Sequence, residues 1–422
     1  MPIRKLPLVP DLDQLKHQAK DLLRAIHAGD ASAVADLREL HPDAIEPGAT
    51  KLADAQLVLA RSYQASSWPR LVHAVELARA IWGDDVDTVR RLVTQNPTLI
   101  HEQVLIRTDS NWGPPMSYAA NLGRDRIIEA LIALGAKDFE HAIDRATLQS
   151  KIDTARLLYA RMSAPRLPND PLDGPAYTLS PSGTALMFEL GARVRDDDGK
   201  RLAPVHVVLE TDSRKPTAKH EILEMYVKHG LELPDTPTMA LHRGRIDLLE
   251  EHLRRDPSLL QRTFSHEEIY PPELGCHDEI LATHGTPLAG ATLLHMCADY
   301  DEIEIARWLL DCGMDVDAKA AVDRDGFGGH TALFATVVSQ PNFWMNHQNR
   351  PQVAPFTHLL LDHGADPNVR ASLRKQLHPG YGEETMHEYR DVTPLSWGER
   401  FHRQIFVSRP AMQLIAERGG RP

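Results

Sequence analysis

The chain has 422 residues, enough for two or three domains of roughly 150 residues each or for one long repeat array. Its 47 basic and 59 acidic residues give a net charge of −12, which disfavours nucleic acid as the main partner. Hydrophobic residues make up 42% and charged residues 25%, and no apolar run approaches the roughly 18 residues of a membrane span. We therefore expect a soluble protein that binds neither nucleic acid nor membrane.

The N-terminal segment and the cysteines indicate a compartment. No apolar stretch precedes Asp11 and Asp13, so a secretory signal is not expected. Cys276, Cys297 and Cys312 are odd in number, widely spaced and outside any CxxC pair. This pattern predicts neither a disulfide framework nor a cysteine-based zinc site, and it favours reduced thiols in a cytoplasmic protein.

The first 80 residues have the pattern of a helical leader. Apolar residues recur at spacings of 3 and 4 from Leu12 to Ile26, which makes one apolar helix face after a possible N-cap at Asp11. Further helices are expected near residues 30–41, 53–63 and 67–82. Ser67 is a possible cap of the last one, with a proline in its first turn.

From residue 83 onward, a short polar turn followed by an amphipathic helix recurs along the chain. Copies of this unit begin near residues 83, 121, 150, 242, 300 and 355. Many copies end at a glycine, which suits the left-handed conformation that follows a helix. Since one unit cannot bury its apolar face alone, stacked units are expected to share a quasi-one-dimensional core.

Two short motifs identify the type of repeat. The segment Thr292-Leu293-Leu294-His295-Met296-Cys297-Ala298 resembles the T-P-L-H-x-A opener of ankyrin repeats. The segment LDHGADPN at residues 361–368 is similar to the exit of the second ankyrin helix. Partial openers begin at Thr331 and Thr393, and the leader resembles those ahead of such arrays in some bacterial proteins.

This resemblance implies an all-α fold, an ankyrin-like helical solenoid preceded by a short helical domain. We expect a leader or capping domain at residues 1–80 and a repeat array at 81–420 with about seven or eight units. The repeats are degenerate in 160–235, and long insertions interrupt the C-terminal third.

The resemblance also places the insertions. Residues 262–290, 316–330 and 371–391 each precede an opener, so they should form fingers at one edge of the array. Residues 340–354 fall between two helices of one repeat, at the opposite edge. Loops this long in a compact array are commonly functional or disordered. Sixteen of the 22 histidines lie after residue 200, several of them in these fingers.

One interpretation of the fingers is a reactive site. Asp325 and His330 flank a glycine-rich turn, and a fixed carboxylate beside an imidazole can set its tautomer and raise its basicity. His277 would come from the neighbouring finger, which completes the catalytic set His277, Asp325 and His330. The alternative is structural, with His330 holding the turn. His277 and His284 are two possible metal ligands, too few for a site, so neither a metal nor a cofactor is expected.

A second interpretation is a binding surface. Aromatic residues in loops are frequent anchors for partners, although each could instead fold back onto its own loop. The candidate binding residues are Trp112, Tyr270, His284, Phe327, Tyr381 and Arg390, with Phe343 and Trp344 as further aromatics in an insertion. The resemblance implies a module that binds another protein of unknown identity through its concave face and fingers. The alternative is an enzyme or a small-molecule-binding protein with its site in the three C-terminal fingers.

Overall fold

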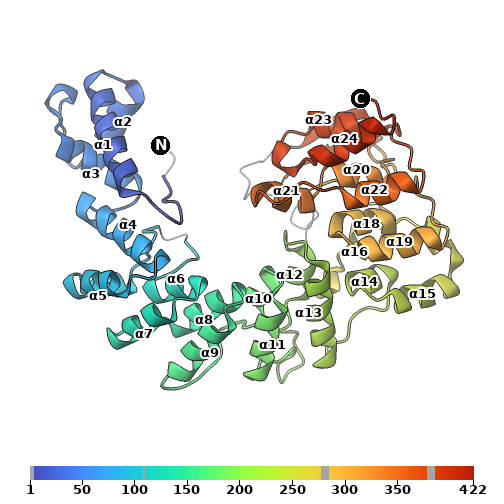
Figure 1. The fold of residues 1–422 in the computed structure, drawn as a ribbon, viewed down its shortest axis with the longest axis horizontal. Coiled ribbons are helices and arrows are strands. Elements are labelled where there is room, and N and C mark those ends of the chain that lie inside the picture. Colours follow the sequence, from blue (N-terminus) through green and yellow to red (C-terminus); the bar gives the residue numbers. More distant parts are fainter. Residues whose placement is uncertain (1–3, 108–109, 277–284, 378–384) are drawn as a thin grey trace. The chain divides into compact units, whose positions relative to one another are not determined.

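The computed structural model describes residues 4–107, 110–276, 285–377 and 385–422, and it is mostly helical (Figure 1). The chain divides into two compact units. Unit 1 comprises residues 1–174 with 189–191, and unit 2 comprises 175–188 with 192–422. Within the described ranges, no helix combines the length and the apolar character needed to cross a membrane.

Unit 1 begins with the predicted leader helices. Asp11 caps the first helix by accepting a hydrogen bond from the backbone N–H of Gln14, as the sequence predicts. Ile26, Ala33, Leu37 and Val58 form the buried core of the leader. The helices of unit 1 are α1 (Leu12–His27), α2 (Ala31–Leu40), α3 (Leu52–Ser62), α4 (Trp68–Trp82), α5 (Val86–Gln95), α6 (Pro115–Leu122), α7 (Asp125–Ala133), α8 (Phe139–Leu148) and α9 (Ile152–Arg161), with 3₁₀ turns at Pro47–Ala49 and Pro97–His101.

Helix pairs stack in order along unit 1. The first helices of successive pairs, α4, α6 and α8, pack on one another, and the second helices α5 and α7 do the same. Helix α6 is almost wholly buried because it lies between its neighbours. The predicted boundary at residue 80 falls inside unit 1, at the end of α4, and the assignment of 1–80 as a capping domain stays a prediction.

Unit 2 contains the C-terminal repeats. Its elements are α12 (Val205–Glu210), α13 (Pro216–Lys228), α14 (Pro237–His242), α15 (Ile246–Arg255), α16 (His266–Ile269), α18 (Leu293–Tyr300), α19 (Ile303–Asp311), α20 (Ala332–Val337), α21 (Gln340–His347), α22 (Pro355–Asp362), β1 (Ala371–Lys375), β2 (His387–Val392), α23 (Pro394–Arg400) and α24 (Arg409–Glu417), with 3₁₀ turns at Pro257–Gln261, Pro272–Leu274 and Gln404–Phe406. Helices α10 (Asp173–Tyr177) and α11 (Pro181–Glu189) include residues of both units.

The openers predicted from the sequence do begin the stacked helices of unit 2. Helices α14, α18, α20 and α23 pack in that order, and Thr292, Thr331 and Thr393 are the N-cap residues of the last three. His295 bonds the Thr292 hydroxyl through Nδ1, at 2.9 Å, and donates from Nε2 to the carbonyl of His330. The opener histidine therefore joins its own helix cap to the next finger.

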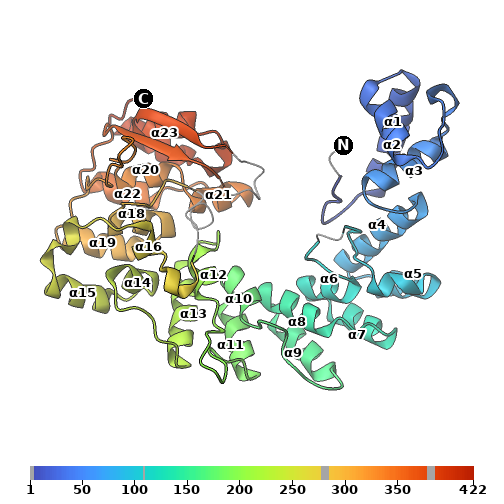
Figure 2. The ribbon, with the colours of Figure 1, turned by 180° about the vertical axis from the view of Figure 1, so that it is seen from behind.

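Two insertions have more regular structure than the sequence indicates. The insertion at residues 340–354 begins with helix α21, whose Phe343 ring stacks 4.9 Å from Phe406. The last finger contains an antiparallel hairpin in which Leu373 pairs with Tyr389 and Lys375 with His387. Figure 2 shows these strands beside α23, which β2 contacts.

Candidate functional site: the finger cleft

The three C-terminal fingers lie edge to edge because their backbones hydrogen-bond to one another. The N–H of Ala321 donates to the carbonyl of Gly290 at 2.7 Å, which joins the first finger to the second. The N–H of Gly328 donates to the carbonyl of Ser372 at 2.7 Å, which joins the second to the third. The predicted convergence of the fingers is thus confirmed for their described parts.

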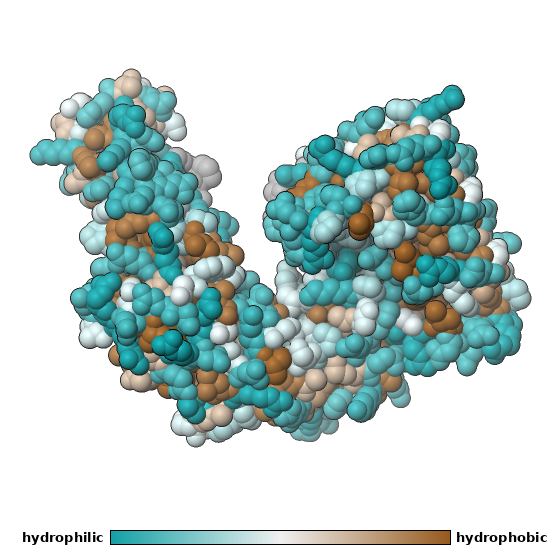
Figure 3. All heavy atoms as spheres, viewed as in Figure 1, coloured by the Kyte–Doolittle hydropathy of each residue, from teal (hydrophilic) through white to brown (hydrophobic). Residues whose placement is uncertain are grey.

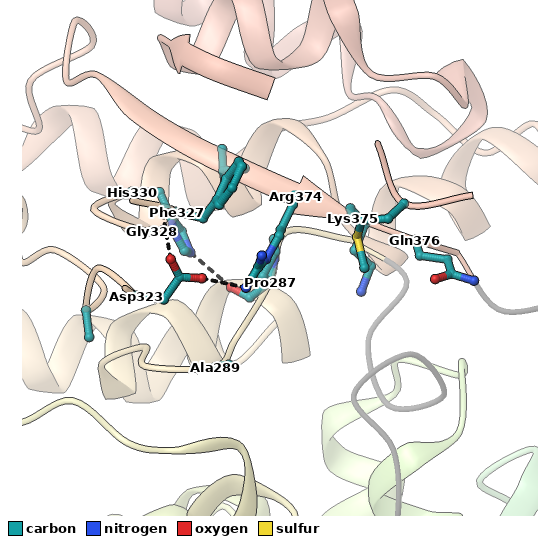
Figure 4. Close-up of a pocket in the computed structure, with 12 residues that line it drawn as sticks. Pro287, Ala289, Asp323, Phe327, Gly328, His330, Arg374, Lys375 and Gln376 are labelled. Atoms are coloured by element: carbon teal, nitrogen blue, oxygen red, sulfur yellow. Dashed lines mark hydrogen bonds and ion pairs between the residues drawn. The ribbon is translucent and has the colours of Figure 1, made fainter. Parts of the chain in front are cut away.

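A small cleft lies where the three fingers meet (Figure 4). Its volume is about 190 Å³. We call it the finger cleft and define it by Pro287 and Ala289 of the first finger, Ala321, Asp323, Phe327, Gly328 and His330 of the second, and Leu373, Arg374, Lys375, Gln376 and Met386 of the third.

Arg374 joins the second and third fingers by charge. Its guanidinium lies 2.7 Å from an Asp323 carboxylate oxygen and 3.1 Å from one of Asp325 (Figure 4 draws the first pair). The guanidinium also covers the ring of Phe327, 5.0 Å from the ring centroid, which is within the range of cation–π contacts. Backbone N–H groups, that of Phe327 first, and the charge of Arg374 lower the pKa of Asp323. The carboxylate therefore stays ionised and keeps the fingers together.

His330 is buried and neutral. Only 1% of it is exposed, and its Nε2–H donates to the carbonyl of Pro287 at 2.9 Å. Burial, followed by the proximity of His295, lowers its pKa to about 3. Asp325 pairs with Arg374, and among the described residues it neither hydrogen-bonds nor forms an ion pair with His330. These contacts support the structural alternative, in which His330 ties the second finger to the first, over the acid–base interpretation.

Two of the candidate binding aromatics, Tyr270 and Phe327, are buried, which favours the alternative in which loop aromatics fold back into the protein. Tyr270 is 1% exposed, and its hydroxyl lies 2.6 Å from that of Tyr300 inside unit 2. Phe327 is 5% exposed because Arg374 and Arg390 cover its ring. The burial of both rings stabilises the fingers from within, and neither ring offers a free face to a partner.

The remaining candidates lie in different places. Trp112 belongs to unit 1, where it is half-buried with its ring 5.0 Å from that of Tyr118, so it is not part of the finger set. Arg390 is exposed on β2, beside the cleft, with its guanidinium 4.3 Å from the Phe327 ring centroid. His277, His284 and Tyr381 lie outside the described residues. In the insertion, Phe343 is buried and Trp344 is half-buried.

Sequence reasoning missed the residues that give the cleft its character. Arg374 was not singled out, although an arginine opposite the Asp-x-Asp of the preceding finger is the kind of pair that joins two loops. Val322 and Met386 were also missed. They are 62% and 48% exposed, and no motif in the sequence marks them. Among the described residues, no three histidine, cysteine or carboxylate side chains are grouped as metal ligands would be.

Comparison with known proteins agrees with the repeat pattern. The ankyrin-repeat family model matches residues 289–318, the segment that contains α18 and α19. Among solved structures, the human ASB11 ankyrin repeat domain is 16% identical, with a TM-score of 0.27, over 73% of this chain and 99% of that one. The ankyrin repeat domain of Bcl-3, a member of the IkappaB family, is 14% identical, with a TM-score of 0.22, over 65% and 97%. A search of curated proteins found no match. Residues 289–318 therefore match an ankyrin repeat, and the helices of that repeat are α18 and α19.

Proposed function

We propose that the protein binds another protein through a finger surface, defined by Val322, Asp323, Arg374, Met386 and Arg390 around the finger cleft. Ankyrin repeats are typically protein-interaction modules. The fold alone does not choose the binding surface, so the assignment depends on the exposed residues of the fingers.

The observation that carries the proposal is the exposure of two apolar side chains beside the cleft. Val322 of the second finger and Met386 of the third are among the most exposed large apolar residues described. Figure 3 shows that, on the face of unit 2 in view, apolar residues form separate small groups among hydrophilic ones. Single exposed apolar residues are common and need no explanation, but Val322 and Met386 lie on two fingers that backbone hydrogen bonds join.

The size and charge of the cleft favour a protein partner over an enclosed ligand. Its volume of about 190 Å³ is below the roughly 300–1,000 Å³ of typical small-molecule pockets. A single side chain of a partner fits such a space, while Val322 and Met386 contact the surrounding surface. Arg374 and Arg390 supply the polar rim, since arginine is enriched at protein interfaces.

The cytoplasmic location of the protein is also a proposal, and so is the alternative function as an enzyme or a small-molecule-binding protein. The three cysteines are free thiols, which supports the reducing cytoplasm. An enzyme or small-molecule site in the fingers has less support, because His330 is neutral and committed to Pro287. We also propose that residues 1–80 are a leader of the type that precedes ankyrin arrays in some bacterial proteins.

The test compares two surface variants of the full chain. The double variant Val322→Asp with Met386→Asp places charge in the finger surface, whereas Leu134→Asp changes an apolar residue of unit 1 that is 39% exposed. Proteins captured from an extract of the source cells are quantified by mass spectrometry, and each candidate is then titrated as a purified protein. We expect one direct partner whose affinity falls at least tenfold with the double variant and is kept by Leu134→Asp. The proposal is overturned if every direct partner binds all three chains equally.

A further inference from the structure

The insertion at residues 338–357 builds a second cavity in unit 2, separate from the finger cleft. Ser339 donates its backbone N–H to the carbonyl of Phe406, and Asn346 donates its side-chain amide to the carbonyls of Ile405 and Val407. Trp344 donates its indole N–H to the carbonyl of Asp212 at 2.8 Å. Helix α21 is therefore fixed at both its start and its middle, and the cavity beside it has a firm wall.

The cavity has the size and the lining of a small-molecule site. Its volume is about 390 Å³, within the range of roughly 300–1,000 Å³ typical of ligand pockets. Apolar walls come from Trp344, Met345, Val353 and Phe356, together with several prolines. Such walls take up the apolar body of a ligand, while a few polar groups orient it.

Two hydroxyl side chains, those of Ser339 and Thr357, belong to the lining of the cavity. Ser339 is 2% exposed and Thr357 is 1% exposed, and both line the cavity. Ser339 occupies the N-cap position of α21 without making the side-chain bond that such a residue usually makes. A hydroxyl can donate one hydrogen bond and accept others, so both side chains can orient a polar group of a ligand.

Asn342 adds a fixed acceptor. Its side-chain amide N–H groups donate to the carbonyls of Thr336 and Val337, at 3.1 and 3.2 Å. These bonds set the orientation of the amide, so that its Oδ1 atom can act as an acceptor. The cavity therefore presents hydroxyl donors and an amide acceptor on one polar wall.

The lining of the cavity contains charged side chains of both signs. Arg214 is neutralised by Asp299, 3.0 Å away, and both side chains are buried. Arg350 and Asp301 also line the cavity, and both are exposed. Neither makes an ion pair with any described residue, so each is available to a ligand group of the opposite charge.

We propose that this cavity binds a small zwitterion with an apolar body, such as a free amino acid with a large apolar side chain. Arg350 binds the carboxylate of the ligand, and Asp301 binds its ammonium group. The hydroxyls of Ser339 and Thr357 and the amide of Asn342 complete the hydrogen bonds, while Trp344 and Phe356 contact the apolar side chain. The site is independent of the proposed protein-binding function, which uses other fingers and other residues.

Calorimetric titration of the full chain with three probes tests the class of ligand. The probes are L-phenylalanine, 3-phenylpropanoate, which lacks the ammonium group, and 2-phenylethylammonium, which lacks the carboxylate. We expect saturable binding of L-phenylalanine with one site per chain and at least tenfold weaker binding of the other two. The proposal is overturned if L-phenylalanine does not bind at millimolar concentration, or if either analogue binds equally well.

Charge-removing variants test the location. Arg350→Gln and Asp301→Asn should each weaken L-phenylalanine at least tenfold, since each removes a charge-assisted contact. Asparagine tolerates the left-handed backbone of residue 301, where φ is 59°, so this variant keeps the local fold. Arg126→Gln, at an exposed arginine of α7, is the matched control and should bind as the parent does. Unchanged affinity in both charge-removing variants places any binding elsewhere and overturns the assignment.

Discussion

At the scale of single residues, unit 2 contains ion pairs that are almost fully buried. The guanidinium of Arg214 is paired with Asp299 at 3.0 Å, and the ammonium of Lys219 lies 2.9 Å from Glu302. Both cations also cover the ring of Tyr300, at 4.6 and 4.1 Å from its centroid. The pairs join α13 and the segment before it to α18 and the start of α19, so they connect two repeats through the core.

Removing one partner of such a pair should be costly. Asp299→Ala leaves the buried Arg214 charge without compensation, and we expect the free energy of unfolding to fall by about 3–5 kcal/mol. The control is Glu304→Ala, which breaks an exposed pair with Arg307 and should cost less than about 1 kcal/mol. Urea denaturation of both variants measures the difference. Equal losses in the two variants would contradict this account of the core.

Buried histidines make stability depend on pH. Burial lowers the pKa of His295 to about 4 and that of His330 to about 3, against about 6.5 in an unfolded chain. Between these values the unfolded state binds protons that the folded state does not, so stability falls as pH decreases from about 6.5 towards 4. Each group contributes up to about 1.4 kcal/mol per pH unit within that window.

The variant His330→Gln removes one of these titrating groups. We expect its unfolding free energy to fall less steeply than that of the parent between pH 6 and pH 4, by up to about 1.4 kcal/mol per pH unit. His358→Gln, at an exposed histidine of α22, should keep the parent slope. Denaturation series at each pH provide the slopes. Parallel curves for the parent and His330→Gln would show that His330 titrates alike in the folded and unfolded states.

The residue scale also shows what the sequence could predict. The opener that contains His295 was recognised because its motif is local in sequence, whereas the bond from His295 to the carbonyl of His330 joins residues that are distant in sequence. Cys312, the C-cap residue of α19, is exposed. Tyr270 and Phe327 were placed in loops correctly, but their burial depends on Tyr300 and Arg374, which are distant in sequence.

At the scale of elements, the fingers depend on a glycine turn that no other residue fits. Gly328 has a φ of 122°, and an added Cβ would lie 2.0 Å from the backbone oxygen of Ala321. The backbone N–H of Gly328 also donates to the carbonyl of Ser372 in the third finger. The close approach of Gly328 to Ala321 is therefore part of the junction between the fingers. Gly326 has a φ of 83°, but a Cβ there meets nothing within 4 Å.

These two glycines make a matched test of the junction. Gly328→Ala must displace backbone and should lower the unfolding free energy by about 3 kcal/mol or more. In Gly326→Ala the added Cβ meets no other atom, and only the left-handed backbone conformation is unfavourable for alanine. The unfolding free energy should therefore fall by about 1–2 kcal/mol. Thermal unfolding of both proteins gives the comparison. If Gly326→Ala is the more damaging change, the junction between the fingers is not where the structure places it.

Elements that depend on local signals were predicted well, and those that depend on distant contacts were not. The helices after Asp11, Ser67 and Thr292 begin at caps that the sequence displays. Helix α21 was missed because its stability comes from Phe406 and the carbonyls of residues 405–407, about 60 residues away. The strands β1 and β2 were read as part of a loop for the same reason, since each is short and is defined by its pairing.

At the scale of the whole molecule, the repeat pattern predicted the helical class of the fold, but it did not predict where the chain divides into two compact units. In the degenerate region 160–235, helices α10 to α13 form without clear openers, and α12 packs on α13, because apolar helix faces can pair without a consensus motif. The division into two compact units near residue 175 has no marker in the sequence that we recognised. The candidate site was predicted as a region of three fingers that includes Arg390, but Val322, Arg374 and Met386 were not predicted.

The central claim is that the finger surface binds a protein, and a hydrogen-exchange footprint of the full chain with its purified direct partner tests it most directly. We expect backbone amides at residues 320–328, 371–376 and 386–390 to exchange more slowly in the complex. The double variant Val322→Asp with Met386→Asp should lose this protection, whereas Leu134→Asp should keep it. Protection confined to other segments, with these three unchanged, would contradict the claim.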